Sequence, residues 1–184
     1  MHLARTFSSA DIQILVVDVQ ERLIVTIHDS QAICRQIERL LDAARLLDIS
    51  VHATEQYPKG LGPTIEPIAA RFTTPPVIKM RFSAFVPELQ AKLDPSRAVI
   101  LVGIETHVCV AQTAADLLAA GFRVLLPRDA VGSRGLLDHE TALARMASFG
   151  VTVTTSEALL FEWIASAEHP QFKSISKLVK DFGS

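Results

Sequence analysis

The chain has 184 residues, of which 49% are hydrophobic and 21% are charged, and its formal net charge at pH 7 is −2. This length is typical of one globular domain, expected here over residues 1–184, and the near-neutral charge disfavours a nucleic-acid-binding protein. No apolar run reaches the roughly 18 residues that a membrane-spanning helix needs, and residues 1–9 lack the apolar stretch of a secretory signal.

Apolar residues are in surplus, with a mean hydropathy of +0.29. The surplus predicts a sheet that is buried on both faces, together with contacts between copies in a homo-oligomer of two or more chains. The two cysteines, Cys34 and Cys109, form no disulfide pattern, which favours a reducing, cytoplasmic setting. Cys34 lies on a predicted helix face and is expected to be inert.

Short β-branched runs alternate with longer helical patterns along the chain. The predicted strands are residues 12–17, 51–54, 77–79, 97–103, 122–126 and 151–154. The predicted helices are residues 30–48, 108–120, 136–149, one that Ser156 caps, and a short one over 170–180. Residues 57–67 are rich in glycine and proline and are expected to form a loop. The alternation predicts an α/β fold with a parallel sheet and right-handed crossovers.

Polar residues follow the predicted strands, at the edge where open α/β sheets bind ligands. Asp18 follows the first strand, Glu55 the second and Lys79 the third, and Cys109 begins the helix after the fourth. A nearby cation and a helix N-terminus both lower a thiol pKa, and a carboxylate can accept its proton. The pattern favours nucleophilic catalysis by Cys109, although each residue alone also fits a structural role.

Four sequence blocks resemble those of the isochorismatase-like cysteine hydrolases. They read ILVVDVQ (14–20), KMRFSAF (79–85), VGIETHVCV (102–110) and RDAVGSR (128–134), and the resemblance covers about residues 8–181. Two further segments, TEQYPKGLGPT (54–64) and HPQFK (169–173), resemble the isochorismatase domain-containing protein 2 subgroup of that family.

The resemblance implies a three-layer, Rossmann-like isochorismatase fold, with a six-stranded parallel sheet in the order 3-2-1-4-5-6. It implies a catalytic triad of Asp18, Lys79 and Cys109, in which Asp18 accepts the thiol proton. It also implies a cis peptide bond before Glu105, which turns the backbone N–H groups of Glu105 and Cys109 toward the substrate oxyanion.

The activity implied is hydrolysis of a small amide, or a related C–N or ester bond, through a thioester on Cys109. Nicotinamidases of the family carry a metal-binding Asp and His cluster after the second strand. This chain has Glu55-Gln56-Tyr57 there, so neither a metal nor another cofactor is expected. True isochorismatases lack the cysteine, which favours acyl transfer here. The residues expected to contact the substrate are Gln20, Glu55, Tyr57, Phe82, Phe85 and His107.

Several alternatives stay open. Phe82 and Phe85 fit ordinary core packing as well as they fit a pocket wall. Asp129 and Arg134 are expected to form a structural ion pair or a cap. The fold also suits a binding or scaffold protein, and vinyl-ether hydrolysis is a third interpretation. The expected partner is a small molecule, with no nucleic acid and no membrane.

Overall fold

The computed structural model describes residues 7–182, so the first six and last two residues of the predicted domain lie outside the described part. The strands are β1 (Ile12–Val17), β2 (Val51–Gln56), β3 (Val77–Lys79), β4 (Ala98–Ile104), β5 (Val124–Pro127), β6 (Val131–Gly132) and β7 (Thr152–Thr154). The longer helices are α2 (Ser30–Leu46), α6 (Ala111–Ala119), α7 (Leu136–Ser148), α8 (Ser156–Ile164) and α9 (Phe172–Phe182). The short helices are η1 (Ser9–Asp11), α1 (Glu21–Ile24), α3 (Pro58–Leu61), α4 (Glu66–Ala69), α5 (Pro87–Gln90), η2 (Thr106–Val110) and η3 (Arg128–Ala130).

All strand pairs in the sheet are parallel, in the order β3-β2-β1-β4-β5-β7. The predicted α/β class and the predicted order of six strands are confirmed. The sheet nevertheless has seven strands, because the two-residue β6 pairs with the end of β4. A two-residue strand is too short to show a periodic pattern in the sequence.

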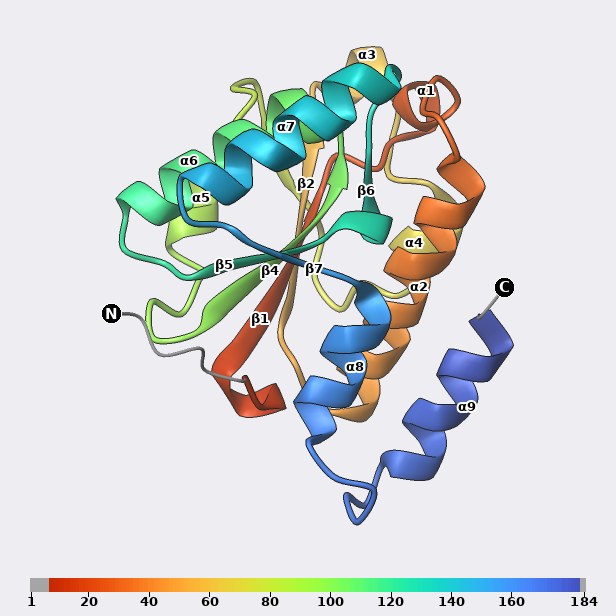
Figure 1. Ribbon diagram of the computed structural model, residues 1–184. Coiled ribbons are helices and arrows are strands. Elements are labelled where there is room, and N and C mark those ends of the chain that lie inside the picture. The colour runs from red at the N-terminus through yellow and green to blue at the C-terminus, as the bar shows by residue number, and fades with distance from the viewer. Residues whose placement is uncertain (1–6, 183–184) are drawn as a thin grey trace.

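The sheet is the middle layer of three (Figure 1). Side chains of each central strand alternate between two apolar clusters. In β1, Ile14 and Val16 face the layer of α2, α8 and α9, whereas Leu15 and Val17 face the layer of α5, α6 and α7. Because both faces are covered, the central strand β4 is apolar along its whole length, and Gln13 is the one polar residue within β1. Within residues 7–182, no helix is long and apolar enough to cross a membrane.

Three local predictions are corrected. The predicted loop over 57–67 contains α3 and the start of α4, because prolines in the first turn of each helix favour helix initiation. The predicted helix over 108–120 is divided, and Cys109 lies in a π-helical turn, η2, before α6 begins. The cap of α8 is Thr155, whose side chain accepts from Ala158 N–H, whereas Ser156 is the first helical residue.

Gly103 lies opposite Val17 in the ladder between the two central strands, β1 and β4. Gly103 has a φ of +115°, and a Cβ atom there would lie 2.1 Å from the Val17 carbonyl oxygen. Only glycine fits this position. The contact brings together the strand ends that carry Asp18 and the turn with Cys109.

We predict that Gly103→Ala lowers the free energy of unfolding by more than about 3 kcal/mol, because β1 and β4 must separate to admit the methyl group. Gly121→Ala is the matched control. Its φ is +87° and no atom lies within 4 Å of the added Cβ, so it retains only the conformational strain, about 1 to 2 kcal/mol. Urea denaturation followed by circular dichroism measures both. Equal losses in the two variants would show that the close strand approach is not limiting.

Candidate active site

Asp18 ends the central strand β1 and adopts a left-handed backbone conformation with φ +53°. Its side chain is fully buried. The carboxylate accepts hydrogen bonds from Thr54 Oγ1 at 2.8 Å and Lys79 Nζ at 2.6 Å, and from the Cys109 thiol. The structure thus brings together Asp18, Lys79 and Cys109, which come from the ends of β1, β3 and the segment after β4.

Lys79 is the last residue of β3 and reaches across the end of β2 to Asp18. Its Nζ also donates to Gln56 Oε1 at 2.9 Å and to the carbonyl oxygens of Phe82 at 2.9 Å and Arg81 at 3.2 Å. A buried ammonium needs such a set of acceptors. The same contacts fix the segment that follows β3 against the site.

Cys109 is 5% exposed and lies in η2, a π-helical turn, which is a feature common at functional sites. The predicted cis peptide bond between Ile104 and Glu105 is confirmed. Thr113 Oγ1 donates to the Cys109 carbonyl oxygen at 2.6 Å and accepts from Ala84 N–H at 2.8 Å. The turn is therefore tied to the segment after β3.

The protonation of the cluster differs from the sequence-based prediction. Burial raises the pKa of the Cys109 thiol to about 12, the negative charge of Asp18 adds to this, and Lys79 opposes it. The prediction of a lowered thiol pKa is wrong, because the sulfur is buried and Asp18 already neutralises Lys79. Burial also raises the pKa of Asp18, against the opposing effects of Lys79 and Thr54. The resting thiol is protonated and donates to the carboxylate.

Glu105 links the π-helical turn η2 to the segment after β6. Its buried carboxylate accepts from Arg134 N–H at 3.1 Å and from Arg134 Nε at 3.0 Å. Of the two roles predicted for Asp129 and Arg134, an ion pair between them is therefore wrong, whereas a capping role fits Asp129. Asp129 instead accepts from the backbone N–H of Ser156 at 2.9 Å and from its hydroxyl at 3.0 Å, at the start of α8. The strand β6 lies between the two residues and carries Arg134 to η2.

The residues predicted to contact substrate divide into two groups. In the first group the side chains are engaged inside the protein. The Gln20 amide is fully buried, donates to the carbonyls of Gln56 and Gly62 at 3.0 and 2.6 Å, and accepts from Gln56 N–H at 2.7 Å. Glu55 Oε1 accepts from the backbone N–H and the hydroxyl of Thr64. Both hold the segment after β2 in place.

Phe85 belongs to the same group. Its ring packs edge to face on Phe122, with centroids 5.9 Å apart. In the second group, Tyr57 and Phe82 are about half exposed, at 47% and 54%. His107 is partly exposed, and its Nδ1 hydrogen-bonds the Ser133 hydroxyl at 3.0 Å. These three side chains are the ones placed to meet a molecule from solvent.

Sequence reasoning missed Thr54, which is 1% exposed and hydrogen-bonds the Asp18 carboxylate directly. It pairs with Val17 in the parallel ladder, one residue before Asp18. A hydroxyl next to the polar end of β2 was the available signal, but only the strand register shows that it faces Asp18.

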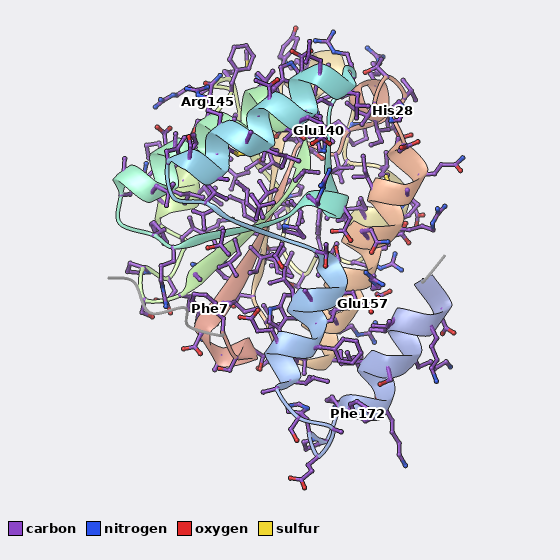
Figure 2. The ribbon with its side chains drawn as sticks, in the orientation of Figure 1. Phe7, His28, Glu140, Arg145, Glu157 and Phe172 are labelled. Carbon is purple, nitrogen blue, oxygen red and sulfur yellow. The ribbon has the colours of Figure 1, made fainter. Side chains whose placement is uncertain are left out.

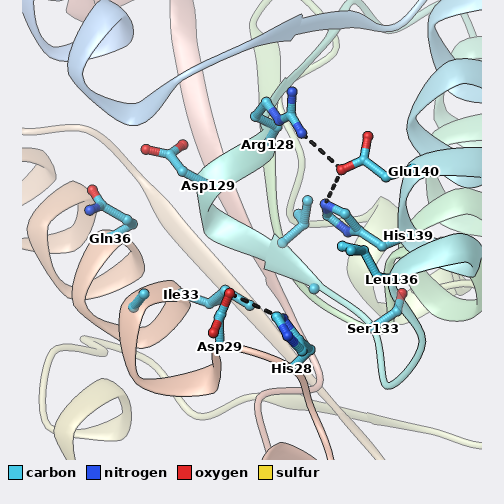
Figure 3. Close-up of a pocket in the computed structure, with 13 residues that line it drawn as sticks. His28, Asp29, Ile33, Gln36, Arg128, Asp129, Ser133, Leu136, His139 and Glu140 are labelled. Atoms are coloured by element: carbon cyan, nitrogen blue, oxygen red, sulfur yellow. Dashed lines mark hydrogen bonds and ion pairs between the residues drawn. The ribbon is translucent and has the colours of Figure 1, made fainter.

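A separate cavity of about 290 Å³ adjoins the catalytic turn (Figure 3). Its walls include His139 and Ser133, which hydrogen-bond Thr106 and His107 of η2 at 3.0 Å each. At its rim, His28 Nδ1 lies 3.1 Å from an Asp29 carboxylate oxygen, and an ion pair joins Arg128 to Glu140 at 2.9 Å. No member of the Asp18 cluster lines it. Among residues 7–182, no group of three His, Cys, Asp or Glu side chains is arranged to hold a metal ion.

Comparison with known proteins identifies related sequences. A family model described as the isochorismatase domain matches residues 13–158. The chain is 44% identical over 169 residues to isochorismatase domain-containing protein 1 of Salmo salar, which covers 89% of this chain and 59% of that protein. It is 42% identical over 167 residues to isochorismatase domain-containing protein 2 of Homo sapiens, covering 89% of this chain and 80% of that protein. The chain therefore spans less than two thirds of the salmon relative.

Solved structures share the fold. The structure described as MAR1 ribonuclease from Caenorhabditis elegans superposes with a TM-score of 0.92 and 39% identity, covering 96% of this chain and 93% of that one. The YcaC gene product of Escherichia coli, described as an octameric hydrolase of unknown specificity, gives a TM-score of 0.89 at 21% identity, with coverage of 99% and 95%. At that identity the likeness shows the fold alone.

We predict that Cys109 reacts slowly with iodoacetamide near neutral pH. A thiol pKa of about 12 leaves about one thiol in ten thousand ionised at about pH 8. Asp18→Asn removes the negative charge beside the sulfur and leaves Lys79, so the thiol pKa falls and alkylation becomes faster. Peptide mass spectrometry of samples quenched over time measures the rate.

Cys34 is the internal control for this experiment. Burial, with a contribution from Glu38, raises the pKa of that thiol to about 11, and Asp18→Asn is expected to leave its rate unchanged. Slower alkylation of Cys109 in Asp18→Asn would contradict the prediction and indicate that Asp18 activates the resting thiol.

Proposed function

The chain belongs to the isochorismatase-like hydrolase family, and from this premise we propose that it hydrolyses a small amide, or a related C–N or ester bond, through a thioester on Cys109. The sequence-based resemblance to this family and to its domain-containing protein 2 subgroup is confirmed. The observation that carries the proposal is the buried cluster in which the Cys109 thiol donates to Asp18, while Lys79 and Thr54 hold the same carboxylate.

In the proposed first step, the Cys109 sulfur attacks the substrate carbonyl carbon while its proton passes to Asp18. The raised pKa of Asp18 makes it a stronger base than an exposed carboxylate. Negative charge then moves from Asp18 to the carbonyl oxygen, where the backbone N–H groups of Glu105 and Cys109 receive it. Lys79 Nζ, 2.6 Å from the Asp18 carboxylate, stabilises the negative charge on it before the transfer.

In the second step, Asp18 gives its proton to the leaving nitrogen or oxygen as the bond to the carbonyl carbon breaks. Water then attacks the thioester with Asp18 as base, which releases the acid and returns the proton to Cys109. Gln20, Glu55 and Phe85 position the surrounding segments. Tyr57, Phe82 and His107 line the approach and select a small substrate.

The proposal also covers the domain organisation, location, cofactor requirement and oligomeric state of the enzyme. It is a single hydrolase domain over residues 1–184, in the cytoplasm, and it works without a cofactor. It forms a homo-oligomer, which is supported by large exposed apolar side chains at Val25, Ile78, Met80 and Leu137.

The name ribonuclease, given to the C. elegans structure, raises a second candidate. Two observations oppose it here. The chain has a net charge of −2, and the Asp18, Lys79 and Cys109 side chains are buried, whereas a polynucleotide needs an open basic surface. RNA is therefore tested beside small amides and esters as a comparison substrate.

We predict that Cys109→Ala lowers turnover at least about a thousandfold on any amide or ester that the protein hydrolyses, and that Asp18→Asn lowers it by about a hundredfold or more. Acid quenching followed by peptide mass spectrometry is expected to find the acyl group on Cys109. Cys34→Ser is the control and keeps full turnover. Full turnover by Cys109→Ala would exclude the thioester, and would favour vinyl-ether hydrolysis if the substrate is an enol ether. Absence of turnover with every amide, ester and RNA substrate tested would favour a binding protein.

Thr54 offers a test through pH. Its hydroxyl lowers the pKa of Asp18, so Thr54→Val, which keeps the shape, is expected to raise that pKa. Because Asp18 must be ionised to accept the thiol proton, the acidic limb of the pH profile of kcat/KM moves to higher pH. Thr54→Ser restores the hydroxyl and the original limb. A Thr54→Val profile that falls uniformly at all pH values would instead indicate a structural role.

A further inference from the structure

Arg39, in the third turn of α2, is a buried charge without a partner. Its side chain is 3% exposed, and it forms no hydrogen bond or ion pair with any residue from 7 to 182, so its Nε is left unsatisfied. Three residues earlier on the same helix face, the buried Gln36 Oε1 also lacks a hydrogen-bond donor. Buried arginines are almost always paired, so the unpaired Arg39 is a candidate for binding a negatively charged group from outside the chain.

Both side chains line an open hollow of about 530 Å³ between α2 and the N-terminus of α8. The other lining residues are Asp129, Thr155, Glu157, Ala158 and Phe161. Gln36 and Asp129 also border the cavity beside η2, and Figure 3 shows their polar ends pointing away from His139. The hollow is separate from the Asp18 cluster, none of whose members lines it.

The charges in the hollow have both signs. Asp129 and Glu157 raise the pKa of Arg39 while its burial lowers it, yet neither carboxylate lies within ion-pair distance. One Asp129 oxygen is occupied by Ser156, and the other has no partner among the described residues. Glu157 is exposed in the first turn of α8 (Figure 2). A simple anion would meet two carboxylates here, and a simple cation would meet Arg39.

We propose that this hollow binds a free α-amino acid. The ligand carboxylate pairs with Arg39 and lies near the N-terminus of α8, which favours negative charge. The ligand ammonium donates to the free Asp129 oxygen, beside Gln36 in the same hollow. The ligand side chain lies against Ala158 and the partly exposed ring of Phe161, which favours an apolar amino acid over glycine. This site does not depend on the proposed hydrolase activity.

Isothermal titration of the full chain with L-leucine tests the proposal. L-leucine is expected to bind, and glycine to bind more weakly. L-leucine methyl ester lacks the carboxylate charge and N-acetyl-L-leucine lacks the ammonium, so each is expected to bind at least tenfold more weakly. No heat of binding at millimolar L-leucine, or equal affinity for the ester, would overturn the proposal.

Variants locate the site. Arg39→Met and Gln36→Leu are each expected to weaken L-leucine binding at least tenfold, while Arg35→Met, an exposed position on the same helix, leaves it unchanged. Arg39→Met removes a buried charge that has no partner, so its melting temperature without ligand is expected to equal or exceed that of the unaltered chain. If Arg39→Met does not fold, Gln36→Leu decides the question. Unchanged affinity in the variant that folds would place any amino acid elsewhere.

Discussion

The Lys79–Asp18 ion pair, at 2.6 Å and fully buried, is the interaction on which the rest of the candidate site depends. Removing two charges from water is costly, and such a pair persists only where every remaining donor and acceptor is also satisfied. Here Thr54, Gln56 and two carbonyl oxygens complete the set. Because Asp18 follows β1, Thr54 and Gln56 lie in β2, and Lys79 and the two carbonyls lie at and after the end of β3, satisfying one ion pair fixes three neighbouring strand ends.

The same pair sets the protonation state of the Cys109 thiol. The opposite charges of Asp18 and Lys79 largely cancel, so the pair gives a thiolate at the buried sulfur little net stabilisation. Cys109 therefore rests as a thiol hydrogen-bonded to Asp18. In the proposed mechanism, negative charge then arises on the substrate only as the proton moves to Asp18. A protonated thiol is also a poor target for oxidants, which react with the thiolate. The arrangement thus links reactivity to the presence of a substrate.

The two unsatisfied groups of α2 differ from this pattern. At the sheet edge the buried charges of Asp18 and Lys79 are paired with each other. Arg39 Nε and Gln36 Oε1 have no hydrogen-bond partner, although both sites are built from charged and amide side chains. Helices cover both faces of the sheet, and the hollow lies between two helices of one face, away from the Asp18 cluster. The molecule therefore has room for a binding site that is independent of its chemistry.

Apolar periodicity in the sequence predicted the parallel α/β sheet and the positions of Asp18, Lys79 and Cys109 at strand ends, because these patterns lie in neighbouring residues. The strand order came from the resemblance of the sequence blocks to those of the family. The sequence did not reveal that β6 joins β4, that Arg134 pairs with Glu105, or that Gln20 is engaged by the backbone. Nor did it reveal the direction of the Cys109 pKa shift or the unpaired state of Arg39. Only the tertiary structure decided these, because burial and pairing depend on groups that are distant in the chain and meet only after folding.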